Sequence, residues 1–185
     1  MTEQELHTVR DGLAADPFGK DLNASVYEHF SLPDNSRQLI DFYRQLQRTY
    51  SDDWRHLVNL ARAYSATGKD SLAVVQLQKL LRTDSSLLEV WMDLAACYQR
   101  LKKTELALRA LNSAIDIDPA FEPAHLSRAQ LLVETEEFEE AAAAVVFSLS
   151  SDKLSKPVVD WLETLDEFLE SRITPPKELL ESPPG

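Results

Sequence analysis

The feature that most constrains the fold is a spacing of 34 residues at which the sequence resembles itself. Shifted by 34 residues, the chain aligns five identical pairs in one register: Leu60 with Leu94, Ala61 with Ala95, Tyr64 with Tyr98, Ala73 with Ala107, and Leu77 with Leu111. A period of this length is typical of arrays in which each repeat is one supersecondary unit. Because a single unit cannot bury its apolar face alone, successive units must stack.

The spacing within each period predicts two antiparallel helices. Leu94, Ala95 and Tyr98 fall on one face of the first helix, and the small side chain of Ala95 allows the second helix to approach closely. Pro119 cannot continue a helix interior and therefore marks the end of the second helix. Only 4 of the 185 residues are glycine, which also favours helices over a turn-rich β fold.

Short motifs within the register point to a known family. Trp91, Leu94, Ala95 and Tyr98 reproduce the spacing W-x2-L-G-x2-Y with alanine for glycine. Downstream, the A-x3-F and closing-proline positions are filled by Ala107, Leu111 and Pro119. At these residues the chain resembles the tetratricopeptide-repeat family. The resemblance implies an all-α fold, a right-handed superhelical solenoid of antiparallel helix pairs with an N-terminal helical extension and a C-terminal capping helix.

We expect six segments along the chain. Residues 1–53 are predicted to form the N-terminal helical extension or a degenerate repeat. Repeats are predicted at 54–87, 88–121 and 122–155, followed by a capping helix at 156–172 and a Pro-rich flexible tail at 173–185. In the capping helix, Trp161 and Phe168 lie beside an apolar stripe that we assign to the core: Val159, Leu162, Leu165 and Leu169.

Three positions inside the repeats carry local expectations. Gly68 lies in the turn of the first repeat, where a left-handed cap is commonly needed. Lys102 occupies the matching position of the second repeat, so that turn must either differ or be strained. Arg128 stands where the family usually has an apolar residue, which indicates unusual packing in the third repeat.

The N-terminal extension also carries helix signals. Thr2 and Glu5 form a possible capping box for a first helix, and Asp16-Pro17 is expected to end it. Residues 31–36 (SLPDNS) are predicted to be the turn between the two helices of the segment 22–50.

The resemblance also implies which residues line a concave groove, because the first helix of each repeat faces it in this family. The predicted partner-binding residues are mixed in charge and polarity: Arg55, Val58, Asn59, Arg62, Glu89, Met92, Asp93, Gln99, Arg100, Leu126 and Gln130. Such a surface suits an extended or helical peptide. Some members of the family clamp a chaperone-tail carboxylate; here Asn59 fits that clamp, but Met92, Asp93, Pro123 and Ser127 replace its other groups, so we exclude this ligand.

The sequence predicts no catalytic residue, no metal ligand and no cofactor. None of the four histidines lies at metal-ligand spacing from another His or from Cys97, and a glycine-rich phosphate loop is missing. The glutamates between Glu134 and Glu140 indicate a solvated face rather than a catalytic pair. Cys97 is predicted to be a buried, inert thiol.

The net charge of −12 argues against nucleic acid and anionic membrane surfaces as direct partners. The N-terminus lacks the apolar segment of a signal peptide, and the run Ala141–Phe147 is far shorter than the ~20 residues of a membrane span. We therefore expect a cytoplasmic protein without direct membrane insertion. Residues 122–185 have a net charge of −9, which suits either a basic partner surface or simply solubility.

The predicted function is a non-catalytic protein–protein interaction module. As an adaptor or assembly subunit, it would bind a segment of another protein in the groove and could belong to a larger complex. The layout of three repeats after a helical extension also resembles the class II chaperones of type III secretion, which bind extended segments of translocator proteins. A secretion-type chaperone that keeps a partner soluble is therefore the alternative. An enzyme is the third option, and self-association through the repeats is a further, structural hypothesis.

Overall fold

The computed structural model describes residues 1–30 and 35–173, and within these ranges it contains ten α-helices and no strand. The chain divides into two compact units, Met1–Lys102 and Lys103–Gly185. The helices of the first unit are α1 (Glu3–Ala15), α2 (Lys20–His29), α3 (Ser36–Thr49), α4 (Trp54–Ala66), α5 (Asp70–Thr83) and α6 (Leu88–Arg100). Those of the second are α7 (Thr104–Ile117), α8 (Glu122–Glu134), α9 (Phe138–Leu149) and α10 (Lys156–Ile173).

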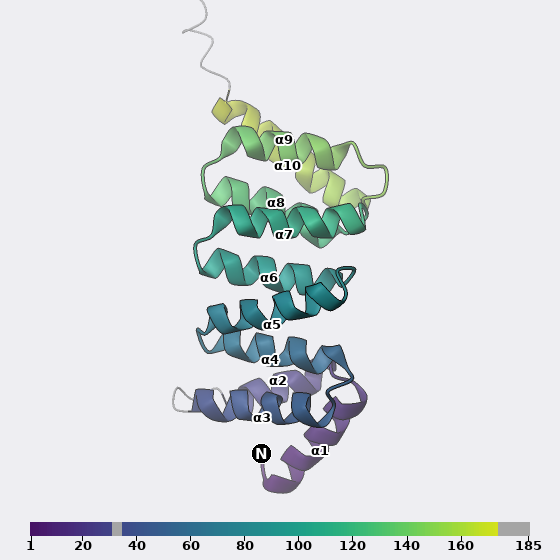
Figure 1. The fold of residues 1–185 in the computed structure, drawn as a ribbon. Coiled ribbons are helices and arrows are strands. Elements are labelled where there is room, and N and C mark those ends of the chain that lie inside the picture. Colours follow the sequence, from purple (N-terminus) through teal and green to yellow (C-terminus); the bar gives the residue numbers. More distant parts are fainter. Residues whose placement is uncertain (31–34, 174–185) are drawn as a thin grey trace, which may run out of the picture. The chain divides into compact units, whose positions relative to one another are not determined.

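Within each unit, helices that follow one another in the sequence also pack together (Figure 1). In the first unit the contacts run from α3 to α4, from α4 to α5 and from α5 to α6. In the second unit they run from α7 to α8, from α8 to α9 and from α9 to α10. This arrangement confirms the prediction of an all-α fold built from consecutive helix pairs.

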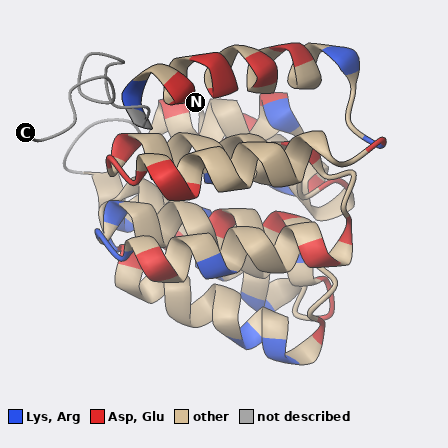
Figure 2. Ribbon diagram, turned by 90° about the horizontal axis from the view of Figure 1, so that it is seen from above, with Lys and Arg blue, Asp and Glu red and all other residues tan. Residues whose placement is uncertain are grey.

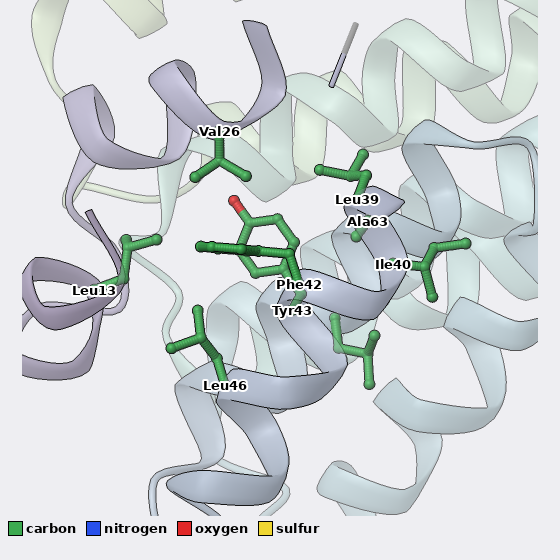
Figure 3. Packing of buried hydrophobic residues seen from close by; sticks show 9 residues of the cluster. Leu13, Val26, Leu39, Ile40, Phe42, Tyr43, Leu46 and Ala63 are labelled. Carbon is green, nitrogen blue, oxygen red and sulfur yellow. The ribbon is translucent and has the colours of Figure 1, made fainter. Parts of the chain in front are cut away.

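The core of the first unit joins the N-terminal helices to the first helix of the repeats. Leu13 of α1 and Val26 of α2 are fully buried and lie around the rings of Phe42 and Tyr43 on α3 (Figure 3). Leu60 and Ala63 of α4 belong to the same apolar cluster. The helices before residue 54 are therefore part of the same hydrophobic core as the repeat that follows them.

The predicted signals at the start of the chain are confirmed. The Thr2 side chain accepts a hydrogen bond from the Glu5 backbone N–H, and the Glu5 carboxylate accepts one from the Thr2 backbone N–H at 2.7 Å. Helix α1 ends at Ala15, directly before Asp16 and Pro17. The predicted turn at residues 31–36 lies mostly outside the described residues.

The second unit is closed by α10, whose apolar side chains separate into a buried and an exposed set. Leu162 and Leu169 are fully buried, as predicted. Val158 is also buried, whereas Val159, which was assigned to the apolar stripe, is only half-buried. Trp161 and Phe168 are 40% and 41% exposed. Acidic residues recur along α10 (Figure 2). The predicted flexible tail lies outside the described residues from 174 onward.

Arg128 of α8 packs with polar partners where an apolar side chain was expected. Its guanidinium donates hydrogen bonds to Asn112 Oδ1 at 3.1 Å, to the Ala144 carbonyl at 3.0 Å and to Ser148 Oγ at 3.3 Å. The group also lies 5.0 Å from the centre of the Phe147 ring. Burial lowers the pKa of Arg128, and these hydrogen bonds compensate much of the solvation that the cation has lost.

In each predicted repeat, the turn after the first helix contains one residue with a left-handed backbone conformation, at the same repeat position. The backbone φ is 73° at Gly68, 58° at Lys102 and 61° at Glu136. The turn at Lys102 therefore keeps the geometry of the Gly68 turn. Because a side chain on Cβ crowds the following carbonyl in this conformation, Lys102 and Glu136 are strained where Gly68 is not.

Introducing glycine at Lys102 and removing it at Gly68 should change the free energy of unfolding in opposite directions. Lys102→Gly should raise the free energy of unfolding by about 0.5–1 kcal/mol, because relief of left-handed strain exceeds the added entropy of the unfolded chain. Gly68→Ala should lower it by about 1 kcal/mol, although a Cβ there meets no atom within 4 Å. Urea unfolding followed by circular dichroism measures both, and changes of the same sign would contradict the interpretation.

Candidate functional site

A cavity of about 350 Å³ opens between α4 and α6 in the first unit. We call it the α4–α6 cavity, and α5 contributes to its lining through Leu77. Its wall combines small or apolar residues with two arginines: Ala61, Arg62, Ser65, Ala66, Leu77, Asp93, Ala96, Cys97 and Arg100. The small side chains leave space between the two helices, because alanine and serine fill much less volume than the usual core residues.

One rim of the cavity is an ion pair between its two helices. Arg62 Nε of α4 lies 2.7 Å from Asp93 Oδ2 of α6, and the two side chains are 39% and 25% exposed. Burial raises the pKa of the Asp93 carboxyl group, and the Arg62 guanidinium opposes that rise. The pair fixes α4 against α6 at this rim and leaves part of the guanidinium in contact with solvent.

The other rim is a network of hydrogen bonds around Asp70, the first residue of α5. Arg100 Nε lies 2.7 Å from Asp70 Oδ1, and the Ser65 hydroxyl donates to the same oxygen. The Asp70 side chain is only 10% exposed, whereas that of Arg100 is 48% exposed. Burial alone raises the pKa of Asp70, but hydrogen bonds from Ser65 and Arg100 hold it below its ordinary value.

Cys97 lies in the wall of the cavity beside this network. Its Sγ is 3.4 Å from a terminal guanidinium nitrogen of Arg100 and 3.9 Å from Ser65 Oγ. The residue is 2% exposed, as predicted, and burial raises the pKa of its thiol. A raised pKa keeps the group protonated at neutral pH, which makes it a poor nucleophile.

The connection between α1 and α2 covers the neighbouring part of α4, and we call residues 17 and 18 the Pro17–Phe18 turn. The Pro17 carbonyl accepts hydrogen bonds from the side-chain amides of Asn59 and Asn23. The Phe18 ring meets the Trp54 ring edge-on at a centroid distance of 5.8 Å. On the cavity side, the Arg62 guanidinium lies 5.0 Å from the centre of the Phe18 ring.

Two of the residues predicted to line the groove are buried. Val58 and Asn59 are 0% and 3% exposed, so in this conformation neither side chain reaches a partner. The repeat position assigned both to the groove, but the Asn59 side chain instead donates to the Pro17 carbonyl, 42 residues earlier in the chain. The hydroxyl of Tyr43 completes the network by donating to Asn23 Oδ1 at 2.7 Å.

The remaining predicted residues fall into three groups. Arg62, Asp93 and Arg100 come together at the α4–α6 cavity. Elsewhere in the first unit, Arg55 is paired with Asp53 at 2.7 Å, Glu89 is exposed, and Met92 and Gln99 are half-buried on α6. In the second unit, Leu126 packs against the core and Gln130 is exposed on α8.

The sequence reasoning missed several residues that shape the site. Ser65, Asp70 and the cavity alanines were not among the residues predicted for the groove, and Phe18 lies outside the predicted repeats altogether. One signal was available for Phe18. A large aromatic residue in a short connection between two helices has no helix face of its own, so it must pack against another element.

In residues 1–30 and 35–173, no helix combines the length and the apolar character that crossing a membrane requires. The same residues bring together no group of three or more His, Cys, Asp or Glu side chains suited to a metal ion.

Comparison with known proteins agrees with the helical architecture. The tetratricopeptide repeat model matches residues 88–121, which comprise α6 and α7. No curated protein sequence matches the chain.

Three solved structures illustrate the similarity of fold. The crystal structure of MamA aligns with a TM-score of 0.60 and 17% identity over 75% of this chain and 79% of that one. The type III secretion chaperone SycD of Yersinia enterocolitica, in complex with a peptide of the translocator YopD, aligns with a TM-score of 0.56 and 20% identity over 66% and 96%. The first repeat domain of Spaghetti (RPAP3), bound to the HSP90 peptide SRMEEVD, gives 0.51 and 21% over 64% and 97%.

The family match coincides with the 34-residue register found in the sequence, and the three aligned structures have TM-scores of 0.51 to 0.60 with this chain. The chain therefore has the all-α tetratricopeptide-repeat fold, with residues 88–121 as a recognisable tetratricopeptide repeat.

Proposed function

We propose that the protein is a non-catalytic interaction module that binds a segment of a partner protein at the α4–α6 cavity. The observation that carries this proposal is the cavity itself, which has a wall of small residues and two half-exposed arginines at its rims. Structural relatives with the same fold have been solved with peptides of HSP90 and YopD bound. An adaptor or assembly subunit of a larger complex would use such a site.

The chemistry of the cavity favours a neutral peptide segment. Both arginines are neutralised by a carboxylate, since Arg62 pairs with Asp93 and Arg100 with Asp70. A strongly charged ligand would have to break one of these pairs and leave a poorly hydrated partner behind. The half-exposed guanidinium groups can instead donate to main-chain carbonyls, while an apolar side chain of the ligand enters between Ala61, Ala66 and Ala96.

Filling the cavity tests the proposal. Random 12-residue peptides displayed on phage are selected on the full chain, and the best is synthesised with a fluorescein label for anisotropy titration. Ala96→Leu should weaken binding at least tenfold, or about 1.4 kcal/mol, because the new side chain occupies the ligand's space. Ala143→Leu, at an exposed position of α9, should leave binding unchanged.

The α4–α6 cavity would not be the binding site if no peptide were selected, or if the selected peptides bound Ala96→Leu as tightly as the wild type. Alanine substitutions of Arg62 and Arg100 are less suitable tests than Ala96→Leu. Each would leave a partly buried carboxylate, Asp93 or Asp70, without its cation and would lower stability as well as binding.

The second candidate is a chaperone of the secretion type. SycD with a YopD peptide, and PcrH with the chaperone-binding region of PopD, align over 96% of their own chains. This candidate predicts a partner that is insoluble when produced alone and soluble when produced with this protein. Co-expression decides between the candidates, because an adaptor's partner remains soluble by itself.

A further inference from the structure

We propose that the Pro17–Phe18 turn is an internal competitor for the partner, and that the partner segment presents an aromatic side chain in the place of Phe18. This inference rests on the proposed function of the α4–α6 cavity. It adds a ligand class, an extended segment with an aromatic residue, and a form of regulation by the chain itself.

Arg62 joins the turn to the cavity. Its guanidinium lies over the Phe18 ring at 5.0 Å, its Nε bonds Asp93, and its side chain also lines the cavity. A ligand that lies along the cavity and extends past Arg62 therefore reaches the Phe18 ring directly. The turn and the ligand would compete for the same face of one guanidinium group.

The turn binds α4 through groups that any peptide can offer. Asn59 donates to a main-chain carbonyl, that of Pro17, and the Phe18 ring contacts Trp54 and Arg62. Neither contact depends on the covalent link to α1 or α2. The contacts of the turn therefore indicate which ligand groups this surface of α4 accepts. These are a carbonyl that accepts a hydrogen bond from the Asn59 amide, and an aromatic ring that packs against the Arg62 guanidinium and the Trp54 indole.

The anchoring of the turn allows it to leave without unfolding the helices beside it. Leu13 of α1 and Val26 of α2 are fully buried and hold these helices against α3, whereas Phe18 is only half-buried. When Asn59 releases the Pro17 carbonyl, Asn23 still donates to it at 3.0 Å. Displacement therefore breaks the contacts of the Phe18 ring with Trp54 and Arg62 and the hydrogen bond from Asn59, and it exposes the buried Pro17. An aromatic ligand restores the ring contacts and the hydrogen bond.

The first test compares ligand selection on the full wild-type chain and on the full chain with Phe18→Ala. Random 12-residue peptides are displayed on phage, and the enriched sequences are synthesised with a fluorescein label. On F18A we expect enrichment of an aromatic position, and binding at least tenfold tighter to F18A than to wild type. The reason is that a site closed most of the time lowers apparent affinity by the fraction that is open. Replacing the aromatic residue of the peptide by alanine should abolish the difference.

The outcomes separate this inference from the proposed function. Peptides that bind both chains equally, yet lose affinity with Ala96→Leu, would support the cavity and overturn the internal competitor. Enrichment without an aromatic position would also overturn it. Failure to select any peptide on either chain would instead contradict the proposed function.

A second measurement on the unmodified chain covers the case in which F18A does not fold. Hydrogen exchange is followed with and without saturating amounts of an aromatic peptide selected on wild type. Displacement predicts faster exchange of the Phe18 and Gly19 amides, because the bonds of these amides to Asp16 open more often once the turn has lost its contacts with α4. Exchange in the flanking helices should be unchanged. Unchanged or slower exchange at these two amides would overturn the inference.

Discussion

Replacement of Tyr43 by alanine is expected to lower the free energy of unfolding of the first unit by about 3–5 kcal/mol, the range for deleting a large buried aromatic side chain. Tyr43 is fully buried at the centre of the cluster formed by α1, α2, α3 and α4 (Figure 3). Its ring packs against Tyr27 and Phe42 at centroid distances of 5.7 Å and 5.3 Å. Urea unfolding followed by circular dichroism and tryptophan fluorescence measures the loss.

Tyr43→Phe is the matched control because it keeps the ring and removes only the hydroxyl. The Asn23 side chain then loses the hydrogen bond that Tyr43 donates, which should cost about 1–2 kcal/mol. If Tyr43→Ala and Tyr43→Phe proved equally destabilising, the ring would contribute little. The N-terminal helices could then not share the core with α4.

Leu162→Ala is expected to destabilise the second unit by about 2–5 kcal/mol, because deleting a buried leucine loses its transfer free energy and leaves a cavity. Leu162 is fully buried against the helices that precede α10. The adjacent residue provides the control, since Trp161 is 40% exposed on the same helix. Trp161→Ala should change the unfolding free energy much less, despite removing the larger side chain.

Circular dichroism during urea unfolding distinguishes these cases without relying on the tryptophan signal. The two units need not unfold together, so the transitions are fitted separately where they are resolved. A larger effect from Trp161→Ala than from Leu162→Ala would mean that α10 buries the opposite face. The assignment of its apolar stripe to the core would then be wrong.

The repeated part of the fold was predictable because its information is local and periodic. Ala95, Ala107 and Pro119 specify close helix packing and a helix end through their own size and backbone chemistry. The left-handed turn at Lys102 was predictable only as an alternative, because lysine does not favour that conformation. The neighbouring hydrogen bonds of the turn, such as Lys102 N–H to the Gln99 carbonyl, impose it.

The candidate site was predictable only in part, because it depends on contacts between distant segments. Arg62, Asp93 and Arg100 were found since their repeat positions place them on neighbouring helices. The burial of Asn59 depends on Pro17, and no periodicity connects the two. The pairing of Arg100 with Asp70 likewise joins the end of one helix to the start of another, which spacing alone does not specify.

The shared core of the first unit has a consequence for dividing the chain into fragments. Leu60 and Ala63 lie within the repeat assigned to 54–87, yet they pack in the cluster that contains Leu13 and Val26. A fragment cut at the repeat boundary would bring this apolar surface into water, and exposed patches of that kind promote aggregation. A stable fragment that contains the first predicted repeat is therefore expected to begin before α1, although the repeat itself is predicted to begin only at residue 54.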